Sequence, residues 1–323
     1  MFGVANRLVP EKGEWQVNLS YRGLKSDTHY SGSERQHQRE VEQTYVINTQ
    51  QALDLAISYT VNDRLSLSLG IPFVRASWAV PTPIRPVPGP RARQEGNGLG
   101  DISLGGRYWI FAPESRHNLS LGLGVKAPTG EYGATQEYPN IDGTNSAVKA
   151  VDQSVQPGDG GWGILLDVQA FRQLSRGTLF ATGTYLVNPR DTNGTPSILV
   201  GLGFGNNPAF AQEGVLVNSV PDQYLVRMGA VMPLGKTGMG ASLAYRVEGL
   251  PRYDLIGDSH GWRRPGYEMF VEPGLSWSTG GTTWSLNVPI GFYRNRLPNP
   301  YSGREGDATF PDFIVLTGLS YRF

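Results

Sequence analysis

A serine beside a histidine is the first group in this sequence that could carry chemistry. Gly257-Asp258-Ser259-His260-Gly261 places the nucleophile and general base of a hydrolase next to each other. Adjacent residues usually point their side chains apart, and no partner carboxamide is evident. His29, His37 and His117 fall in predicted loops or turns, where we expect solvated side chains. The sequence therefore predicts no enzyme and no catalytic residue.

Metal and cofactor chemistry is not indicated either. The chain has 0 cysteines and no cluster with metal-ligand spacing, and its glycine-rich stretches lack the strand-to-helix context of a phosphate loop. Its 28 Lys and Arg balance its 28 Asp and Glu, which disfavours a basic surface for nucleic acid. We expect no cofactor, no metal and no nucleic-acid partner.

Charged residues that alternate with apolar ones are the remaining groups able to act on a solute. Along each predicted strand they share the face opposite the apolar side chains, which makes it the inward face of a barrel. Charges there are tolerated when hydrated, as pore-lining groups, or when paired across strands, as filling of the interior. The inward set is Arg22, Asp54, Asp101, Arg107, Lys126, Asp167, Arg227, Arg246, Glu248, Glu268, Glu272 and Arg322.

Twelve segments with a period of two must position these residues. They cover residues 13–25, 53–59, 65–73, 100–111, 119–125, 164–170, 179–187, 224–232, 243–247, 267–277, 284–292 and 312–323. Six long connections alternate with five short ones. This pattern predicts an all-β fold, a single antiparallel 12-stranded up-and-down transmembrane β-barrel with short periplasmic turns and long extracellular loops. We expect one domain over residues 1–323, beginning with a periplasmic segment of about residues 1–12.

Composition agrees with a barrel of the Gram-negative outer membrane. The chain has 42 Gly, 15 Tyr, 12 Phe and 7 Trp, which suit tight turns and aromatic girdles. No run approaches the ~18 apolar residues of a spanning helix, and mean hydropathy is −0.30. Met1-Phe2-Gly3-Val4-Ala5-Asn6-Arg7 has no apolar stretch of a secretory signal, so export implies that Met1 has replaced the leader.

The last predicted strand resembles the closing strand of bacterial outer-membrane barrels. Its apolar face runs from Phe313 to Tyr321 and ends on the terminal Phe323. The resemblance implies outer-membrane lipids as surroundings and the outer-membrane assembly machinery as a partner that reads Phe323.

Several segments together resemble one family, the outer-membrane transporters assigned to the MetA pathway of phenol degradation. They are Tyr59 to Phe73, Gly98 to Tyr108, Leu119 to Gly130 and Gln156 to Trp162. The likeness extends from residue 45 to the end of the chain, except over residues 188–222. It implies a channel or transporter for small molecules, aromatic or hydrophobic ones among them.

The connection over residues 188–222 is too apolar for a freely solvated loop. One patch contains Ile198, Val200, Leu202 and Phe204, and another covers residues 215–217. These side chains could fold into the mouth as a constriction, stand above the barrel as a hairpin, or contact a partner. We expect the constriction slightly more than the hairpin.

Three functions follow from these residues. A channel for passive passage of small molecules agrees best with the inward charges and the apolar loop. A non-conducting scaffold or receptor would instead display loops such as the proline-rich one that carries Arg85, Arg91 and Arg93. A lipid hydrolase would need a working pair of Ser259 and His260.

Overall fold

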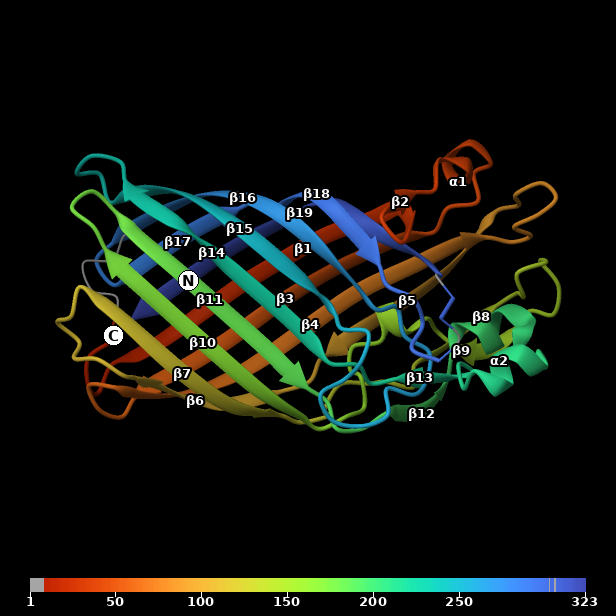
Figure 1. Cartoon of the computed structure of the whole chain (residues 1–323), viewed down its shortest axis with the longest axis horizontal. Helices are drawn as coiled ribbons and strands as arrows, with labels where there is room; N and C mark the ends of the chain where they lie inside the picture. Colours follow the sequence, from red (N-terminus) through yellow and green to blue (C-terminus); the bar gives the residue numbers. More distant parts are fainter. Residues whose placement is uncertain (1–8, 302, 305) are drawn as a thin grey trace.

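The described residues, 9–301, 303–304 and 306–323 of a computed structural model, form a closed barrel (Figure 1). Its wall consists of β1 (Trp15–Ser31), β3 (Ile47–Thr60), β4 (Leu65–Pro81), β5 (Arg91–Leu99) with β6 (Ser103–Trp109), β7 (His117–Lys126), β10 (Gly163–Gln173), β11 (Thr178–Val187), β14 (Gln223–Pro233), β15 (Met239–Leu250), β16 (Gly266–Thr279), β17 (Thr282–Asn287) with β18 (Ile290–Arg296), and β19 (Asp307–Arg322). Since β5 and β6, and likewise β17 and β18, each form one interrupted wall strand, the wall has 12 strands. The predicted fold is confirmed.

Pairing of the first strand with the last closes the wall. Antiparallel register runs from Gln16 opposite Arg322 to Ser31 opposite Asp307. The Trp15 amide donates to the Phe323 carbonyl over 2.9 Å. Closure leaves few backbone groups without a partner, which a strand wall in lipid requires. The start of β1 and the end of β19 lie toward the end of the barrel that carries the short turns (Figure 1).

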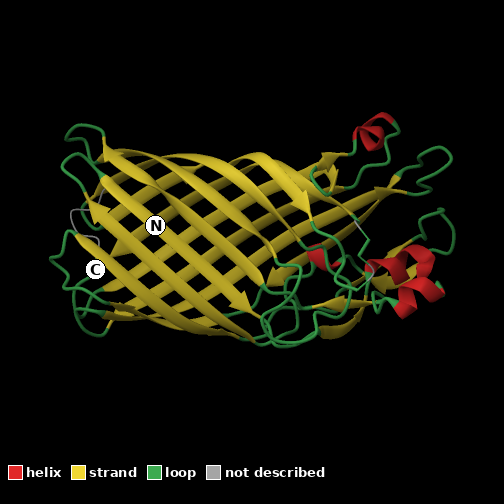
Figure 2. Cartoon of the chain, viewed as in Figure 1, coloured by secondary structure: helices red, strands yellow, loops and turns green. Residues whose placement is uncertain are grey.

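The long connections gather at the opposite end and carry short elements of their own (Figure 2). These are β2 (Glu34–Arg35), α1 (His37–Val41), β8 (Thr135–Tyr138), β9 (Ala147–Ala150), the 3₁₀ turn η1 (Gln153–Val155), β12 (Thr192–Pro196), the π-helical turn η2 (Val200–Phe204), α2 (Pro208–Gln212) and β13 (Val217–Ser219). Among the described helices, none combines the length and hydropathy needed to cross a membrane.

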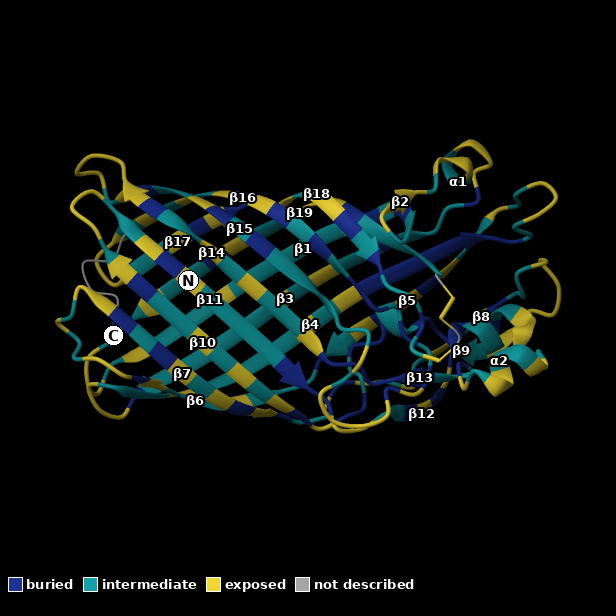
Figure 3. Cartoon of the chain, viewed as in Figure 1, coloured by how far each residue is buried: buried dark blue, intermediate teal, exposed yellow. Residues whose placement is uncertain are grey.

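The two faces of the wall differ in chemistry. Exposed and less exposed positions alternate along the strands (Figure 3). On the apolar face of the predicted strands, which a barrel turns toward lipid, Leu53, Leu67, Leu121, Leu166 and Leu286 are 42 to 53% exposed, and Val315 is half-buried. Aromatic side chains pair on neighbouring strands near both ends, as Trp15 with Tyr59 and Tyr267 with Tyr293. Such belts mark the two membrane interfaces.

Two expectations about the long connections are wrong. His29 is not solvated, because β1 continues past the predicted strand and buries the ring at 4% exposure. Its Nδ1 lies 3.1 Å from Asp307 Oδ2, and its Nε2 accepts from the Val46 amide at 2.8 Å. Arg91 and Arg93 do not lie in a loop but in β5, which pairs with the outer part of β4. The strand continues past its predicted end there, while the prolines at positions 81–90 suggested an earlier strand end.

The predicted periplasmic segment of residues 1–12 falls mostly outside the described residues, since positions 1–8 are not described. Val9 is 1% exposed and contacts Trp109 and Phe171. Both aromatic residues lie on the inward face of the wall, so the chain at Val9 lies against the interior near the end with the short turns.

Candidate transport pathway

A chain of ion pairs crosses the barrel interior. Arg22 Nη2 on β1 lies 2.5 Å from Glu248 Oε1 on β15. These strands are not neighbours in the wall, so the contact spans the interior. Arg246 also pairs with Glu248, and its Nη1 is 3.5 Å from Glu272 Oε2. Four predicted pore-lining residues therefore hold one another.

Arg227 and Arg246 face each other in the register of β14 and β15, as the turn near Lys236 predicts. Their repulsion is offset by Glu272, which is 1% exposed and receives both guanidinium groups. Arg227 Nη2 lies 2.7 Å from Glu272 Oε1. A buried carboxylate between two arginines is stable only because both partners are present.

A second pair depends on a glycine. Arg107 on β6 and Asp167 on β10 are both in register with Gly122 on the strand between them. Arg107 Nη2 reaches across to Asp167 Oδ1 at 2.7 Å. A Cβ on Gly122 would stand 2.9 Å from the Cβ of Asp167, so this crossing needs a residue without a side chain.

Of the remaining predicted lining residues, two more are paired and one is not. Glu268 Oε1 lies 2.9 Å from Arg294 Nε, and Arg322 Nε lies 3.6 Å from Glu14 Oε1. Asp54 has no ion-pair partner among the residues that the structure describes. Paired charges thus dominate the interior, and the pore-lining role of the set stays a prediction.

Asp101 and Lys126 anchor a loop at the outer end of the wall. Lys126 Nζ is 3.5 Å from Asp101 Oδ2 and also pairs with Asp159. The Gly130 amide donates to Asp101 Oδ1 at 2.9 Å. These contacts tie both ends of the connection between β7 and β10 to the wall.

The middle of that connection enters the mouth of the barrel. At η1, Ser154 Oγ accepts from Asn48 Nδ2 at 2.6 Å, and its carbonyl accepts from Gln50 Nε2 at 3.1 Å. A Cβ on Gly96 of β5 would stand 1.9 Å from the Val155 carbonyl oxygen, so only glycine allows this approach. Segment 150–157 therefore lies against the inner faces of β3 and β5.

An apolar cluster covers this part of the mouth. Trp78 and Val80 come from the face of β4 that points inward, since Leu67 and Phe73 on the other parity are exposed. The cluster consists of Ala76, Trp78, Val80, Tyr138, Val151, Val155 and Ile198. We call these seven residues the mouth cluster.

The predicted constriction residues separate into two groups. Ile198 is 2% exposed within the mouth cluster, and Leu202 contacts the same cluster. Val200 is half-buried. Phe204 is 37% exposed and meets Phe210 of α2 edge to face, with ring centroids 6.0 Å apart. The connection over residues 188–222 thus contains a hairpin of β12 and β13, and Ile198 packs in the mouth cluster. Its role as a constriction stays a prediction.

Asp152 and Arg264 join two long connections across the mouth. Asp152 is fully buried, and its Oδ1 accepts from Arg264 Nη1 at 3.0 Å. Oδ1 also accepts from the Ser154 amide at 2.9 Å, and Gln94 Oε1 accepts from the Asp152 amide at 2.7 Å. Burial alone would raise the pKa of Asp152, but the Arg264 guanidinium and the Ser154 hydrogen bonds outweigh it and lower the pKa.

Sequence reasoning missed this pair because its residues are 112 positions apart. One local signal existed. Asp152-Gln153-Ser154 is a capping pattern, in which the Asp152 side chain accepts from an amide two residues on. It predicts a turn but not the arginine that meets it.

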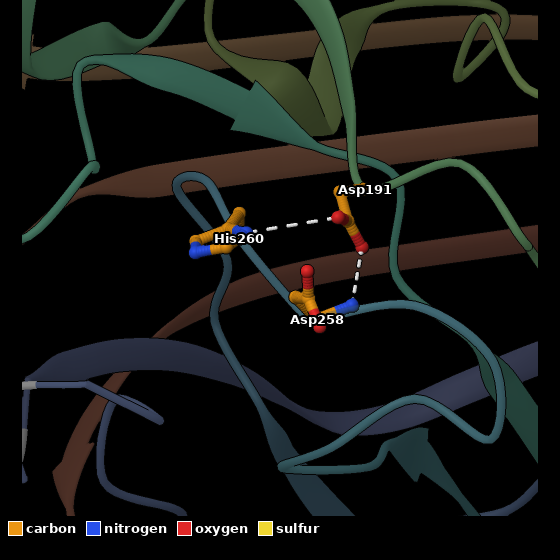
Figure 4. Close-up of side chains that lie close together, drawn as sticks. All are labelled: Asp191, Asp258 and His260. Atoms are coloured by element: carbon orange, nitrogen blue, oxygen red, sulfur yellow. Dashed lines mark hydrogen bonds and ion pairs between the residues drawn. The ribbon is translucent and has the colours of Figure 1, made fainter.

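The candidate hydrolase residues do not form a catalytic pair. Ser259 Oγ accepts from the Asp254 amide at 2.8 Å, whereas His260 Nδ1 faces Asp191 Oδ2 at 3.6 Å. Asp191, Asp258 and His260 bring ligand-type atoms within 4.8 Å of one another (Figure 4). Asp191 Oδ1 already accepts from the Asp258 amide at 2.8 Å, so this surface group fastens the loop between β15 and β16 to residue 191.

Residues 44–170 match the model of a family described as "Putative MetA-pathway of phenol degradation". The family predicted from the sequence is confirmed over this range. It covers the wall from β3 into β10, together with the mouth segment at 150–157. The likeness expected beyond residue 170 is not part of the match. No curated protein sequence matches the chain.

Solved structures of low sequence identity are similar to this chain. An outer membrane channel of the COG4313 group from Pseudomonas putida F1 has 12% identity and a TM-score of 0.63, with 100% of each chain covered. The translocator domain of the autotransporter NalP from Neisseria meningitidis has 11% identity and a TM-score of 0.48, covering 97% of this chain and 90% of its own. The toluene transporter TodX from Pseudomonas putida has 9% identity and a TM-score of 0.44, covering 97% and 89%. The chain is a β-barrel of the outer-membrane type.

Proposed function

We propose that the protein is a passive outer-membrane channel for small apolar molecules, aromatic ones among them. The observation that carries this proposal is the mouth cluster, in which Trp78 of the wall packs with Val155 and Ile198 of two outer connections. Apolar side chains favour an uncharged solute, because a hydrated ion would lose water there without gaining a polar partner.

The paired charges of the interior also support a preference for uncharged solutes. Because Glu248 and Glu272 are each held by arginines, they present no ring of free carboxylates that would attract cations. The outer membrane channel from P. putida F1 has a barrel that matches this chain along its whole length, which supports a channel role for this barrel.

Substitution of Val155 by Thr tests the proposal with little change in volume. Val155 is 0% exposed, so a buried hydroxyl there should weaken the packing of the mouth cluster, raise ion conductance and lower the preference for an aromatic solute. Val148→Thr in β9 of the same connection is the control, since Val148 is 70% exposed. Single-channel conductance and influx of an uncharged aromatic dye would be measured in bilayers with a lipopolysaccharide outer leaflet.

A wild-type protein that carries neither ions nor dye would exclude the channel. The chain would then act as a scaffold that displays its outer loops. A selective effect of Val155→Thr, with Val148→Thr equal to wild type, is the result expected for a channel with an apolar entrance.

A further inference from the structure

A pocket lies at the outer rim of the wall, between the connection from β7 to β10 and the connection that follows β11. Its volume is about 420 Å³, which is the size of sites for small ligands. β11 ends and β10 begins next to each other at this rim (Figure 1). The residues that line it are Pro128, Tyr132, Gly160, Trp162, Pro189 and Arg190. We call this space the rim pocket.

The exposed Trp162 places the rim pocket at the outer membrane interface. Ile164 and Leu166 are 37 and 42% exposed on the lipid-facing parity of β10. Trp162 lies two positions before Ile164, continues that parity at the outer end of the strand, and is 63% exposed. Tyr185, the register partner of Leu166, stacks on Tyr224 with ring centroids 6.5 Å apart. Because Trp and Tyr gather at the height of lipid head groups, the rim pocket faces those head groups.

The segment that carries Trp162 is fastened on both sides of the indole. Asp159 pairs with Lys126, and its Oδ1 accepts from the Gly161 amide at 2.9 Å. A Cβ on Gly161 would stand 2.6 Å from Val220 Cγ1, so the backbone packs closely against the next connection. None of these contacts involves the indole ring itself. A rigid backbone therefore presents an exposed aromatic ring, which is a preorganised binding surface.

Arg190 supplies a positive charge whose orientation is fixed. Its Nη1 donates to the Gly160 carbonyl at 2.6 Å, and its Nε donates to the Thr192 carbonyl at 2.7 Å. Its Nη2 has no hydrogen-bond partner among the residues that the structure describes. Gly160 has a φ of +80°, and a Cβ there would stand 2.7 Å from Tyr132 Cγ, so glycine lets the ring of Tyr132 lie against the same backbone. Cation and rings are thus held together by one residue.

We propose that the rim pocket binds a phosphorylated sugar of lipopolysaccharide in the outer leaflet. The guanidinium of Arg190 donates from Nη2 to the phosphate, as arginine does in many phosphate sites. The C–H face of the sugar ring packs on the indole of Trp162, with Tyr132 beside it.

The make-up of the rim pocket favours this ligand over simpler ones. A wholly apolar ligand would desolvate the Arg190 guanidinium without giving it a partner, and an inorganic anion would make no use of the exposed indole. None of the six lining residues belongs to the mouth cluster. The site is therefore separate from the proposed channel entrance and does not depend on conduction.

Binding of deacylated lipopolysaccharide to the refolded barrel tests the site, because a ligand without acyl chains does not mix with the detergent. Calorimetric titration gives the Kd. Trp162→Leu keeps an apolar side chain, Arg190→Gln removes the charge, and each should weaken the Kd about tenfold. Trp277→Leu and Arg85→Gln are the matched controls, since Trp277 is 47% exposed near the short turns and the Arg85 side chain is 69% exposed on another outer connection. Both controls should bind as wild type does.

Two further ligands separate the parts of the site. Enzymatic removal of phosphate from the oligosaccharide should weaken binding to wild type, whereas Arg190→Gln should bind both forms equally. Inorganic phosphate alone should bind far more weakly than the oligosaccharide. Heat-modifiable gel mobility checks that each variant is folded, and Tyr132→Leu replaces a variant that is not. No binding to wild type, wild-type Kd values in folded rim-pocket variants, or equal affinity for inorganic phosphate would each overturn the proposal.

Discussion

At the scale of single residues, parity decides whether a side chain meets lipid or the interior. Leu121 is 53% exposed on the outer face of β7, whereas Ser120 beside it is 0% exposed inside. A shift of one position would exchange these environments. The lipid-facing assignment can therefore be tested at one residue.

Replacing Leu121 by Arg should lower the free energy of unfolding in bilayers by about 2 to 4 kcal/mol, because the charge would enter the apolar belt. Leu121→Met is the control, since it keeps an apolar side chain of similar volume. Urea titration of the protein refolded into lipid vesicles measures both. A Leu121→Arg protein as stable as wild type would mean that the facing is wrong.

The Asp152–Arg264 pair should hold the mouth segment at neutral pH. Arg264→Gln would leave a buried carboxylate without its cation, so we expect a loss of about 3 to 5 kcal/mol in the opening free energy of residues 150–157. Hydrogen exchange of that segment measures the change. Asp152→Asn combined with Arg264→Gln should recover much of it, because no charge then remains buried. If residues 150–157 of the Arg264→Gln protein exchanged hydrogen at the wild-type rate, the pair would not be what holds the segment.

The stabilisation that the Asp152–Arg264 pair provides should be lost on acidification. The pKa of Asp152 in the folded protein lies below its ordinary value of 3.8. Its stabilising contribution is therefore present above the ordinary value and is lost as the pH falls through the folded value. In wild type, residues 150–157 should therefore stay docked from neutral pH down to that range.

For the charged side chains, the sequence predicts which face of a strand they occupy but not which distant residue they contact. Alternation places Arg22, Glu248 and Arg246 on one face, and the short turn near Lys236 fixes the pairing of Arg227 with Arg246. It does not predict that Arg22 meets Glu248, 226 positions away, because that contact depends on the curvature of the closed wall. The loop residues Asp152 and Arg264 carry no period at all, so their meeting could not be predicted.

At the scale of elements, strands were predictable and long connections were not. Period-two patterns bounded by short turns depend on local sequence, so each of the 12 predicted segments lies in a wall strand, although β1 and β4 run further outward and β5 was not expected. The connection over residues 188–222 was recognised as apolar, yet its burial depends on Trp78 of β4 and Val155 of η1. The element that enters the mouth, η1, belongs to another connection and shows only a capping pattern.

Deletion of residues 195–218, closed by a short Gly-Ser bridge, should raise ion conductance several-fold if this hairpin is a lid. It removes Ile198 from the mouth cluster. A deletion confined to α2, residues 208–212, is the matched control, because that helix has no buried residue. Single-channel recordings compare the two proteins. Unchanged conductance in a correctly folded 195–218 deletion would exclude the lid and leave a hairpin or a partner site.

At the scale of the whole molecule, the last strand completes the barrel by pairing with the first. The Phe323 side chain is 62% exposed, while its backbone amide and carbonyl both bond to Trp15, at 3.0 and 2.9 Å. A substitution of the side chain leaves these backbone bonds available. Assembly in the cell and stability of the finished barrel can therefore be separated at this residue.

Phe323→Ser should reduce the amount of barrel inserted in the outer membrane of cells, because the terminal aromatic is the expected signal for the assembly machinery. The same protein should refold in detergent or lipid with nearly wild-type stability, since the lost side chain is exposed and the register with β1 is kept. Trp277→Ser is the control, as Trp277 is 47% exposed and lies on β16, away from the terminus. Heat-modifiable gel mobility of membrane fractions reports assembly, and urea titration reports stability. Equal insertion of Phe323→Ser and wild type would remove Phe323 from recognition, and an equal deficit in Trp277→Ser would assign the effect to the interfacial aromatics as a group.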